Sequence, residues 1–196
     1  DWLVEREIRR LPKHTFSRTV AWPLVNLMRL WEMTQGVPEE EALHLAVTRS
    51  AKQAADALSG LAVTAHGGSI HAGISLEGLA RYHQLSADPK VARYLVELAN
   101  HWTRSNYDAR KRAFYLKSGD SSQAGPTMSG LVVYGVAYAA SLKPGPSLRK
   151  VATDARTDLP RVTDDAKEFA MLYRSSLRAA SFLAAGAETA GRSGGS

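Results

Sequence analysis

The sequence predicts an all-α fold, built from helical hairpins that form part of an α/α toroid. Apolar residues recur at three- and four-residue steps, without the sustained alternation that is typical of strands. Turns rich in Gly, Pro and Asp divide these helical stretches into pairs, and each pair opens with a helix that is apolar on most faces. Since such a helix is buried on all sides, we expect buried inner helices wrapped by amphipathic outer ones.

Three hairpins are predicted in the middle of the chain, over residues 19–58, 71–102 and 127–156. Each turn combines a helix stop with a proline at or near the first position of the next helix. These turns are Gly36-Val37-Pro38, Asp88-Pro89 and Pro144-Gly145-Pro146. The turn chemistry therefore marks where each outer helix begins.

The hairpins align with one another. Residues 27–34 align without gaps on residues 79–86, and Tyr82 aligns on Tyr138. A fixed period of roughly fifty residues is typical of stacked supersecondary units. We therefore expect one helical domain over residues 1–190, with further helical patterns at 1–17 and 164–190, and a flexible tail at 191–196.

Two stretches carry a family resemblance. Residues 71–82, HAGISLEGLARY, lead into a Ser-Ala-Asp-Pro turn, and residues 31–36, WEMTQG, have a similar form. Both resemble the six-hairpin glycosidase-like proteins, in which a Leu-x-x-Tyr/Trp-x-x-Thr-Gly-Asp type of turn recurs around an (α/α)6 barrel. The resemblance covers residues 19–156 and concerns the fold. It implies a glycoside hydrolase or a polysaccharide lyase.

The chain departs from that family in having three hairpins where the closed barrel has six. It begins at Asp1, with no Met and no signal-peptide pattern, which fits a processed protein or a piece of a longer one. Terminal repeats normally carry a polar cap, and three hairpins leave apolar edges uncovered. We therefore expect a second chain or segment to complete the toroid.

Composition narrows the classes of partner. There are 25 Lys and Arg residues against 19 Asp and Glu, which gives a net charge of +6. This balance favours an acidic glycan as substrate, with nucleic acid less favoured and a solvated basic surface as the non-functional alternative. No apolar run is long enough to span a bilayer. The absence of cysteine excludes disulfides and thiolate chemistry, and it fits an exported or a cytoplasmic protein equally.

The loops that precede the inner helices should gather at one end of a toroid, and loop 66–71 is the most distinctive of them. It places two glycines, which allow a ligand to approach the backbone, between His66 and His71. Because histidine can act as an acid or a base near neutral pH, we predict both as catalytic residues. His71 should lie in the loop, with Ser69 capping the next helix. The structural alternative is a simple turn.

Glu77 is the third candidate catalytic residue. Its equivalents in the other hairpins are apolar, namely Val25 and Val133. A carboxylate in an apolar stripe must find a partner or line a cavity, since burying it unpaired is costly. Glu77 would act as an acid or base if it lines the interior of the ring. It is an ordinary surface residue if the helix turns it outward.

The connector 104–117 interleaves basic and aromatic side chains. Such a mixture suits a sugar with carboxylate or sulfate groups, and it equally suits a nucleic-acid backbone or a plain solvated connector. We predict substrate contacts from Tyr107, Arg110 and Tyr115, and from His14 and Arg18 ahead of the first hairpin. The sequence contains no complete metal-ligand set and no cofactor motif, so neither a metal nor a cofactor is expected.

These features predict a carbohydrate-active domain, a hydrolase or lyase that acts on an acidic glycan held across the loops. The alternative is a non-catalytic helical repeat module that binds an acidic protein or nucleic acid through a basic face. A polar concave end would favour the first, and an open basic groove would favour the second.

Overall fold

The computed structural model describes residues 16–117, 120, 122, 124–143, 146–157 and 178–184. Most of these residues are helical, and the strands among them are two short segments that pair with each other. The predicted all-α class is therefore confirmed. Among the described helices, none is both long and apolar enough to cross a membrane.

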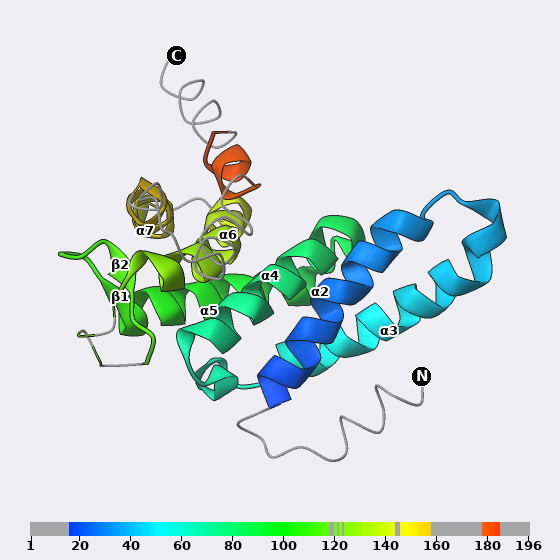
Figure 1. Cartoon of the computed structure of the whole chain (residues 1–196), viewed down its shortest axis with the longest axis horizontal. Coiled ribbons are helices and arrows are strands. Elements are labelled where there is room, and N and C mark those ends of the chain that lie inside the picture. Colours follow the sequence, from blue (N-terminus) through cyan, green and yellow to red (C-terminus); the bar gives the residue numbers. More distant parts are fainter. Residues whose placement is uncertain are drawn as a thin grey trace.

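The described elements follow one another as three helical hairpins (Figure 1). The first consists of α2 (Phe16–Thr34), the 3-10 turn η1 (Pro38–Glu40) and α3 (Glu41–Ser59). After the 3-10 turn η2 (Val63–His66) come α4 (Ser69–Ser86) and α5 (Pro89–Asn106). Strands β1 (Tyr107–Asp108) and β2 (Ala113–Phe114) then lead to α6 (Pro126–Leu142) and α7 (Pro146–Thr157).

These hairpins coincide with the three that the sequence predicts, because the turn residues act as expected. Gly36 ends the first hairpin's inner helix with a φ of 75°. At the second turn, Ala87 adopts a φ of 50°, and the Asp88 carboxylate accepts a hydrogen bond from the Lys90 amide at 2.8 Å. Pro89 then occupies the first position of α5.

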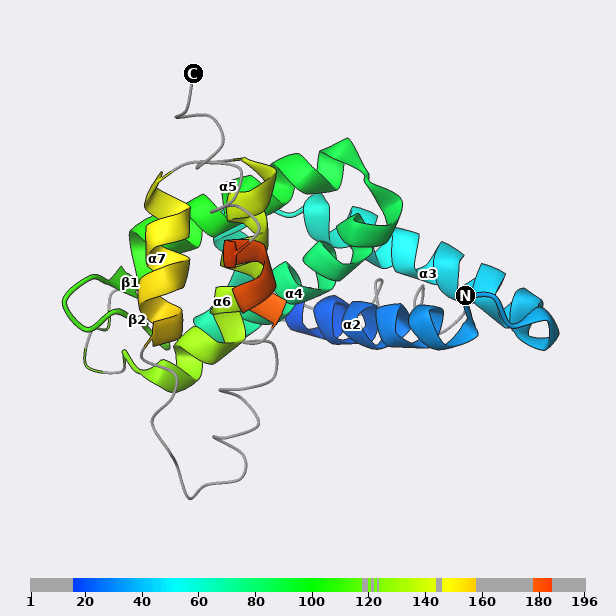
Figure 2. The ribbon, with the colours of Figure 1, turned by 90° about the horizontal axis from the view of Figure 1, so that it is seen from above.

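The helices form two layers. In one layer α2 packs on α4 and α4 packs on α6, whereas in the other α3 packs on α5 and α5 packs on α7 (Figures 1 and 2). The predicted inner helices thus lie in one layer and the predicted outer helices in the other. The expectation that every inner helix is buried on all sides is wrong for α2, where Asn26, Arg29 and Glu32 are exposed. The internal repeat and the closure of such layers into a toroid remain predictions.

The inner helix α4 lies at the centre, and all of its residues from 72 to 82 are buried. Glycines let its neighbours approach closely. A Cβ atom added at Gly73 would lie 2.8 Å from the Leu131 carbonyl oxygen of α6, and one added at Gly78 would lie 3.3 Å from Leu24 of α2. A Cβ added at Gly135 of α6 would collide with the side chain of Leu76.

The ends of the chain are described only in part. The predicted tail at 191–196 lies outside the described residues, as does nearly all of the predicted helix at 1–17. Of the helix predicted at 164–190, residues 178–184 are described and are helical. There the Phe182 ring packs on the rings of Tyr134 and Tyr138, at centroid distances of 5.7 and 4.9 Å.

The close packing of α4 against α6 can be tested by adding a single methyl group at the contact. Replacing Gly135 by Ala should lower the free energy of unfolding by roughly 1–3 kcal/mol, because the added methyl overpacks the contact with Leu76. Gly125→Ala is the matched control, since nothing lies within 4 Å of its Cβ position. Urea denaturation measures both variants, and equal stabilities would contradict the close packing.

Candidate functional site

The loops that precede α4 and α6 meet at one end of the array, whereas the residues that precede α2 lie outside the described part of the chain. The Ser69 amide, at the start of α4, donates to the Leu116 carbonyl at 3.1 Å. The Gly125 amide, just before α6, donates to the Phe114 carbonyl at 3.3 Å. We call residues 63–71, 107–117 and 124–129 the hairpin end, because the β1–β2 hairpin joins its parts.

A built turn forms the tip of this hairpin. The Asp108 carboxylate accepts hydrogen bonds from the amides of Arg110 and Lys111, at 2.9 and 3.1 Å, and Arg112 completes the turn with a φ of 51°. Such side-chain-to-backbone bonds are how aspartate fixes a turn. The turn therefore holds three consecutive basic side chains, all of them exposed, in a defined place.

The strands of the hairpin are anchored to the core. The ring of Tyr107 packs on the fully buried ring of Phe114, at a centroid distance of 5.2 Å. The Tyr115 amide donates to the Asn106 carbonyl at 2.8 Å, and the Ser69 hydroxyl donates to the Tyr115 carbonyl. The basic tip is thus carried on a rigid support.

Positive charge gathers at the hairpin end. Arg110 and Arg112 of the hairpin end and Arg104 in the last turn of α5 are exposed, and among the described residues none of the three forms an ion pair. The N-terminal ends of α4 and α6 add the partial positive charge of their backbone dipoles. This part of the surface can therefore attract an anion.

The predicted substrate-binding residues of the connector all lie in this hairpin. Tyr115 is half-buried just after β2 and Arg110 is exposed in the turn, whereas the hydroxyl of Tyr107 is buried. Arg18 belongs to α2, but its side chain is outside the described part, and His14 lies outside the described residues altogether.

His66 is completely buried and connects three elements. Its Nδ1 atom lies 3.0 Å from the Ser75 hydroxyl of α4, and its Nε2 atom lies 2.6 Å from the Tyr94 hydroxyl of α5. Burial, together with the nearby His71 and His101, lowers the pKa of His66 to about 4. In this conformation the ring is neutral and joins η2 to both helices, rather than facing a ligand.

His71 lies within the first turn of α4, so its predicted place in the preceding loop is wrong. The reason is the sharp turn at Gly67, whose φ of 74° requires glycine and lets the helix begin at Ser69. Ser69 also differs from its predicted role as a cap, because its hydroxyl bonds to the Tyr115 carbonyl instead. His71 packs over Gly67, where an added Cβ would lie 2.8 Å from its Nδ1 atom.

Glu77 is also buried, and it has found a partner. Its Oε1 atom accepts a hydrogen bond from Nε of Arg81 at 3.1 Å and forms an ion pair with Nη2 of the same guanidinium at 3.0 Å. Ser75, which His66 contacts, and Glu77 are separated by about 200° around the helix. The structure therefore brings His66 and His71 together and places Glu77 on the other side of α4, so the three candidate catalytic residues do not meet at one point.

Sequence reasoning missed Arg81, which organises that other side of α4. Its guanidinium lies 5.8 Å from the centroid of the Tyr134 ring, and its Nη1 atom is 3.8 Å from the Glu32 carboxylate of α2. Arg178, in the helical segment 178–184, approaches the same Glu32 at 3.7 Å. The four-residue spacing of Glu77 and Arg81 on a helix was the available signal for this ion pair.

Two tyrosines of α6 complete this cluster. The Gln84 side chain donates to the Tyr134 hydroxyl at 2.6 Å, and Nδ1 of His83 lies 2.7 Å from the Tyr138 hydroxyl. Burial raises the pKa of Tyr138 to about 12. Because Phe182 packs against both tyrosine rings, this cluster lies under the segment 178–184 and offers no open site.

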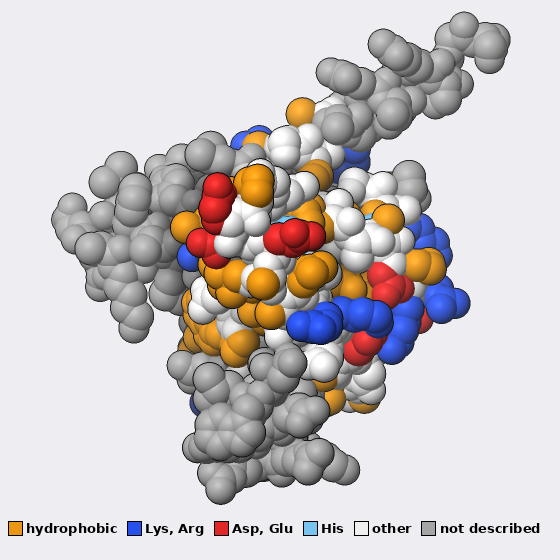
Figure 3. Space-filling model, turned by 90° about the vertical axis from the view of Figure 1, so that its right-hand side faces the viewer, with side chains coloured by type: hydrophobic (Ala, Val, Ile, Leu, Met, Phe, Trp, Pro, Cys, Tyr) orange, Lys and Arg blue, Asp and Glu red, His pale blue; other side chains and the backbone are white. Residues whose placement is uncertain are grey.

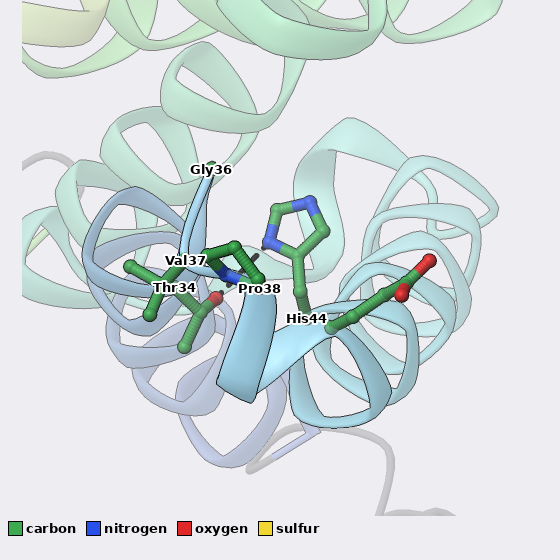
Figure 4. A pocket seen from close by; sticks show the side chains of 6 residues that line it. Thr34, Gly36, Val37, Pro38 and His44 are labelled. Carbon is green, nitrogen blue, oxygen red and sulfur yellow. Dashed lines mark hydrogen bonds between the residues drawn. The ribbon is translucent and has the colours of Figure 1, made fainter.

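The turn between α2 and α3 holds a pocket of about 240 Å³ at the far end of the first hairpin (Figure 4). The Thr34 hydroxyl lies 3.0 Å from Nδ1 of His44 there, beside Val37 and Pro38. Hydrophobic side chains gather on this end of the molecule (Figure 3). Met33 is 74% exposed and Leu45 is 55% exposed.

No metal site is evident in the described part of the chain, where no three His, Cys, Asp or Glu side chains come together around one point. Comparison with known proteins finds no matching family model, no similar curated protein and no similar solved structure. The resemblance to the six-hairpin glycosidase-like proteins therefore stays a prediction.

The burial of His66 makes the stability of the fold depend on pH. The folded pKa of about 4 lies below the ordinary histidine pKa of 6.5, so between these values the unfolded chain binds more protons. The contribution of His66 is complete above pH 6.5 and is lost as the pH falls toward 4. Between pH 7 and 4.5 the loss should be roughly 2 kcal/mol.

Urea unfolding at the two pH values measures this loss, and His66→Gln is the comparison because glutamine does not titrate. The variant should be less stable at pH 7 and should lose less stability on acidification. An equal loss in both proteins would show that His66 does not titrate as described.

Proposed function

We propose that this chain is a carbohydrate-active helical domain that binds an acidic glycan at the hairpin end. The observation that carries the proposal is the turn closed by Asp108, which presents Arg110, Lys111 and Arg112 from a rigid support. The net charge of +6 and the resemblance to six-hairpin glycosidase-like proteins support an acidic sugar as the ligand.

Arginine is well suited to such a ligand. Its planar guanidinium can donate two parallel hydrogen bonds to a carboxylate or a sulfate group, and such charge-assisted bonds are roughly twice as strong as neutral ones. Because hydrogen bonds already fix the backbone of the turn, little backbone entropy is lost when the ligand binds. The half-buried ring of Tyr115, directly after β2, adds an aromatic surface beside the charges.

The geometry favours binding over catalysis by the predicted residues. His66 has no exposed surface, and the Glu77 carboxylate is bonded to Arg81. Neither offers a free acid or base to a bound sugar in this conformation. The proposal is therefore recognition of an acidic glycan, and it assigns no step of hydrolysis or elimination to His66 or Glu77.

The second candidate function is the binding of nucleic acid, which the same exposed arginines would favour. Both ligands are polyanions, so salt dependence alone does not separate them. A direct comparison of polygalacturonate with double-stranded DNA, at equal ionic strength, does so. We expect the glycan to bind more tightly.

The test removes charge from the hairpin tip. The double variant Arg110→Ser/Arg112→Ser should weaken the binding of polygalacturonate by about tenfold or more, because charge-assisted hydrogen bonds are lost. The control, Arg49→Ser/Arg93→Ser, removes the same charge from exposed positions on α3 and α5. It should change the affinity by no more than about threefold, the effect of overall charge.

Titration calorimetry at about 0.1 M salt is the measurement, since surface charges are only partly screened there. Equal effects of the two double variants would contradict a site at the hairpin. Tight binding of DNA without binding of the glycan would favour the second candidate function instead.

A further inference from the structure

A second pocket, of about 160 Å³, lies between α2, α3 and α4, near the C-terminal ends of α2 and α4. The hairpin end contains the N-terminus of α4, so the two sites occupy opposite ends of this helix. The pocket is lined by Met28, Trp31, Thr48, Ala51, Lys52, Tyr82, Leu85 and Ser86. It is independent of the glycan surface proposed above.

The floor and walls of this pocket are apolar. Met28 and Ala51 are almost completely buried at its base, and the aromatic side chains of Trp31 and Tyr82 form its walls. Leu85 stands at the rim with 43% of its surface exposed. A bound apolar group would cover it.

The aromatic walls are already in place. The Trp31 Nε1 group donates to the Thr48 hydroxyl at 3.1 Å, and the Trp31 ring lies 4.9 Å from the ring of His44. Tyr82 is held by the burial of α4. Since small-molecule sites are usually preformed and mostly apolar, this arrangement resembles such a site.

Few polar groups of the pocket have bonding capacity to spare. The Thr48 hydroxyl accepts from Trp31 and donates to the His44 carbonyl at 2.8 Å. The Lys52 ammonium donates to Asp56 at 2.7 Å, but an ammonium has three N–H groups, so two are left. The Ser86 hydroxyl accepts from the Asp88 amide at 3.3 Å and shares a hydrogen bond with the Tyr82 hydroxyl. The Lys52 ammonium is therefore the main donor that the lining of this pocket offers to an acceptor on a ligand.

The few hydrogen-bonding groups that line the pocket determine which class of ligand it can bind. A sugar carries several hydroxyls, and leaving them unpaired against apolar walls would cost free energy. An apolar cavity of about 150 Å³ is large enough to bind benzene. We propose that this pocket binds a small aromatic molecule with one hydrogen-bond acceptor, its ring between Trp31 and Tyr82 and its acceptor on the Lys52 ammonium.

Phenylacetamide, which has one ring and one carbonyl acceptor, is the probe, and ligand-observed NMR with titration calorimetry measures its affinity. Wild-type protein should bind it saturably below about 10 mM. Ala51→Leu fills the pocket and should weaken binding by at least about tenfold. The control Ala42→Leu makes the same change at an exposed position of α3 and should leave the affinity unchanged.

Lys52→Met tests the polar contact, and it also keeps the test valid if Ala51→Leu does not fold, because the Lys52 side chain is 61% exposed. Lys52→Met should weaken the affinity for phenylacetamide by about tenfold, the loss expected for one charge-assisted hydrogen bond. The affinity for toluene, which has no acceptor, should stay the same.

Three results would overturn the proposal. The first is the absence of saturable phenylacetamide binding to the wild-type protein. The second is an equal affinity of Ala51→Leu and Ala42→Leu, provided that both are folded. The third is that glucose binds in the pocket more tightly than phenylacetamide, which would make it a sugar site.

Discussion

The packing of α4 between α2 and α6 is the constraint on which the rest of the structure depends. Every residue from 72 to 82 is buried, and the close approach on both sides is possible because glycines stand at the contacts. A helix buried on all sides has no solvent for its polar side chains, so each one must find a partner within the protein. Ser75 bonds to His66 on one side, and Glu77 bonds to Arg81 on the other.

This constraint also decides where binding can occur. His66 and Glu77, which most resemble a catalytic base and acid in the sequence, instead form the bonds that hold the helices together. The accessible chemistry lies instead at the two ends of α4. At its N-terminal end the β1–β2 hairpin presents exposed arginines, and at its C-terminal end Trp31 and Tyr82 enclose a small apolar pocket. One buried helix thus separates two surfaces of opposite character.

Local sequence patterns were sufficient to predict the helices. The features that were not predicted depend on contacts between residues that are far apart in the sequence. Turn residues such as Asp88 and Pro89 act on their immediate neighbours, so the boundaries of the helices at that turn follow from the sequence alone. The partner of His66 is Tyr94, which is far away along the chain, and no local pattern connects them. The position of His71 depended on the conformation of Gly67, since a glycine pair permits several turns and the sequence does not select one. The turn at Asp108 could have been predicted from the sequence. Its role in holding the basic side chains depends on the anchoring of the two strands, which the sequence does not show.

Native-state hydrogen exchange tests the central place of α4 most directly. If α4 is the structural centre, the amides of residues 72–82 should exchange only when the whole domain unfolds, and their opening free energy should equal the global free energy of unfolding. Amides of α3 and α7, which have exposed faces, should open at lower free energy. Exchange of α4 through a local opening that is easier than the opening of α3 would contradict the account.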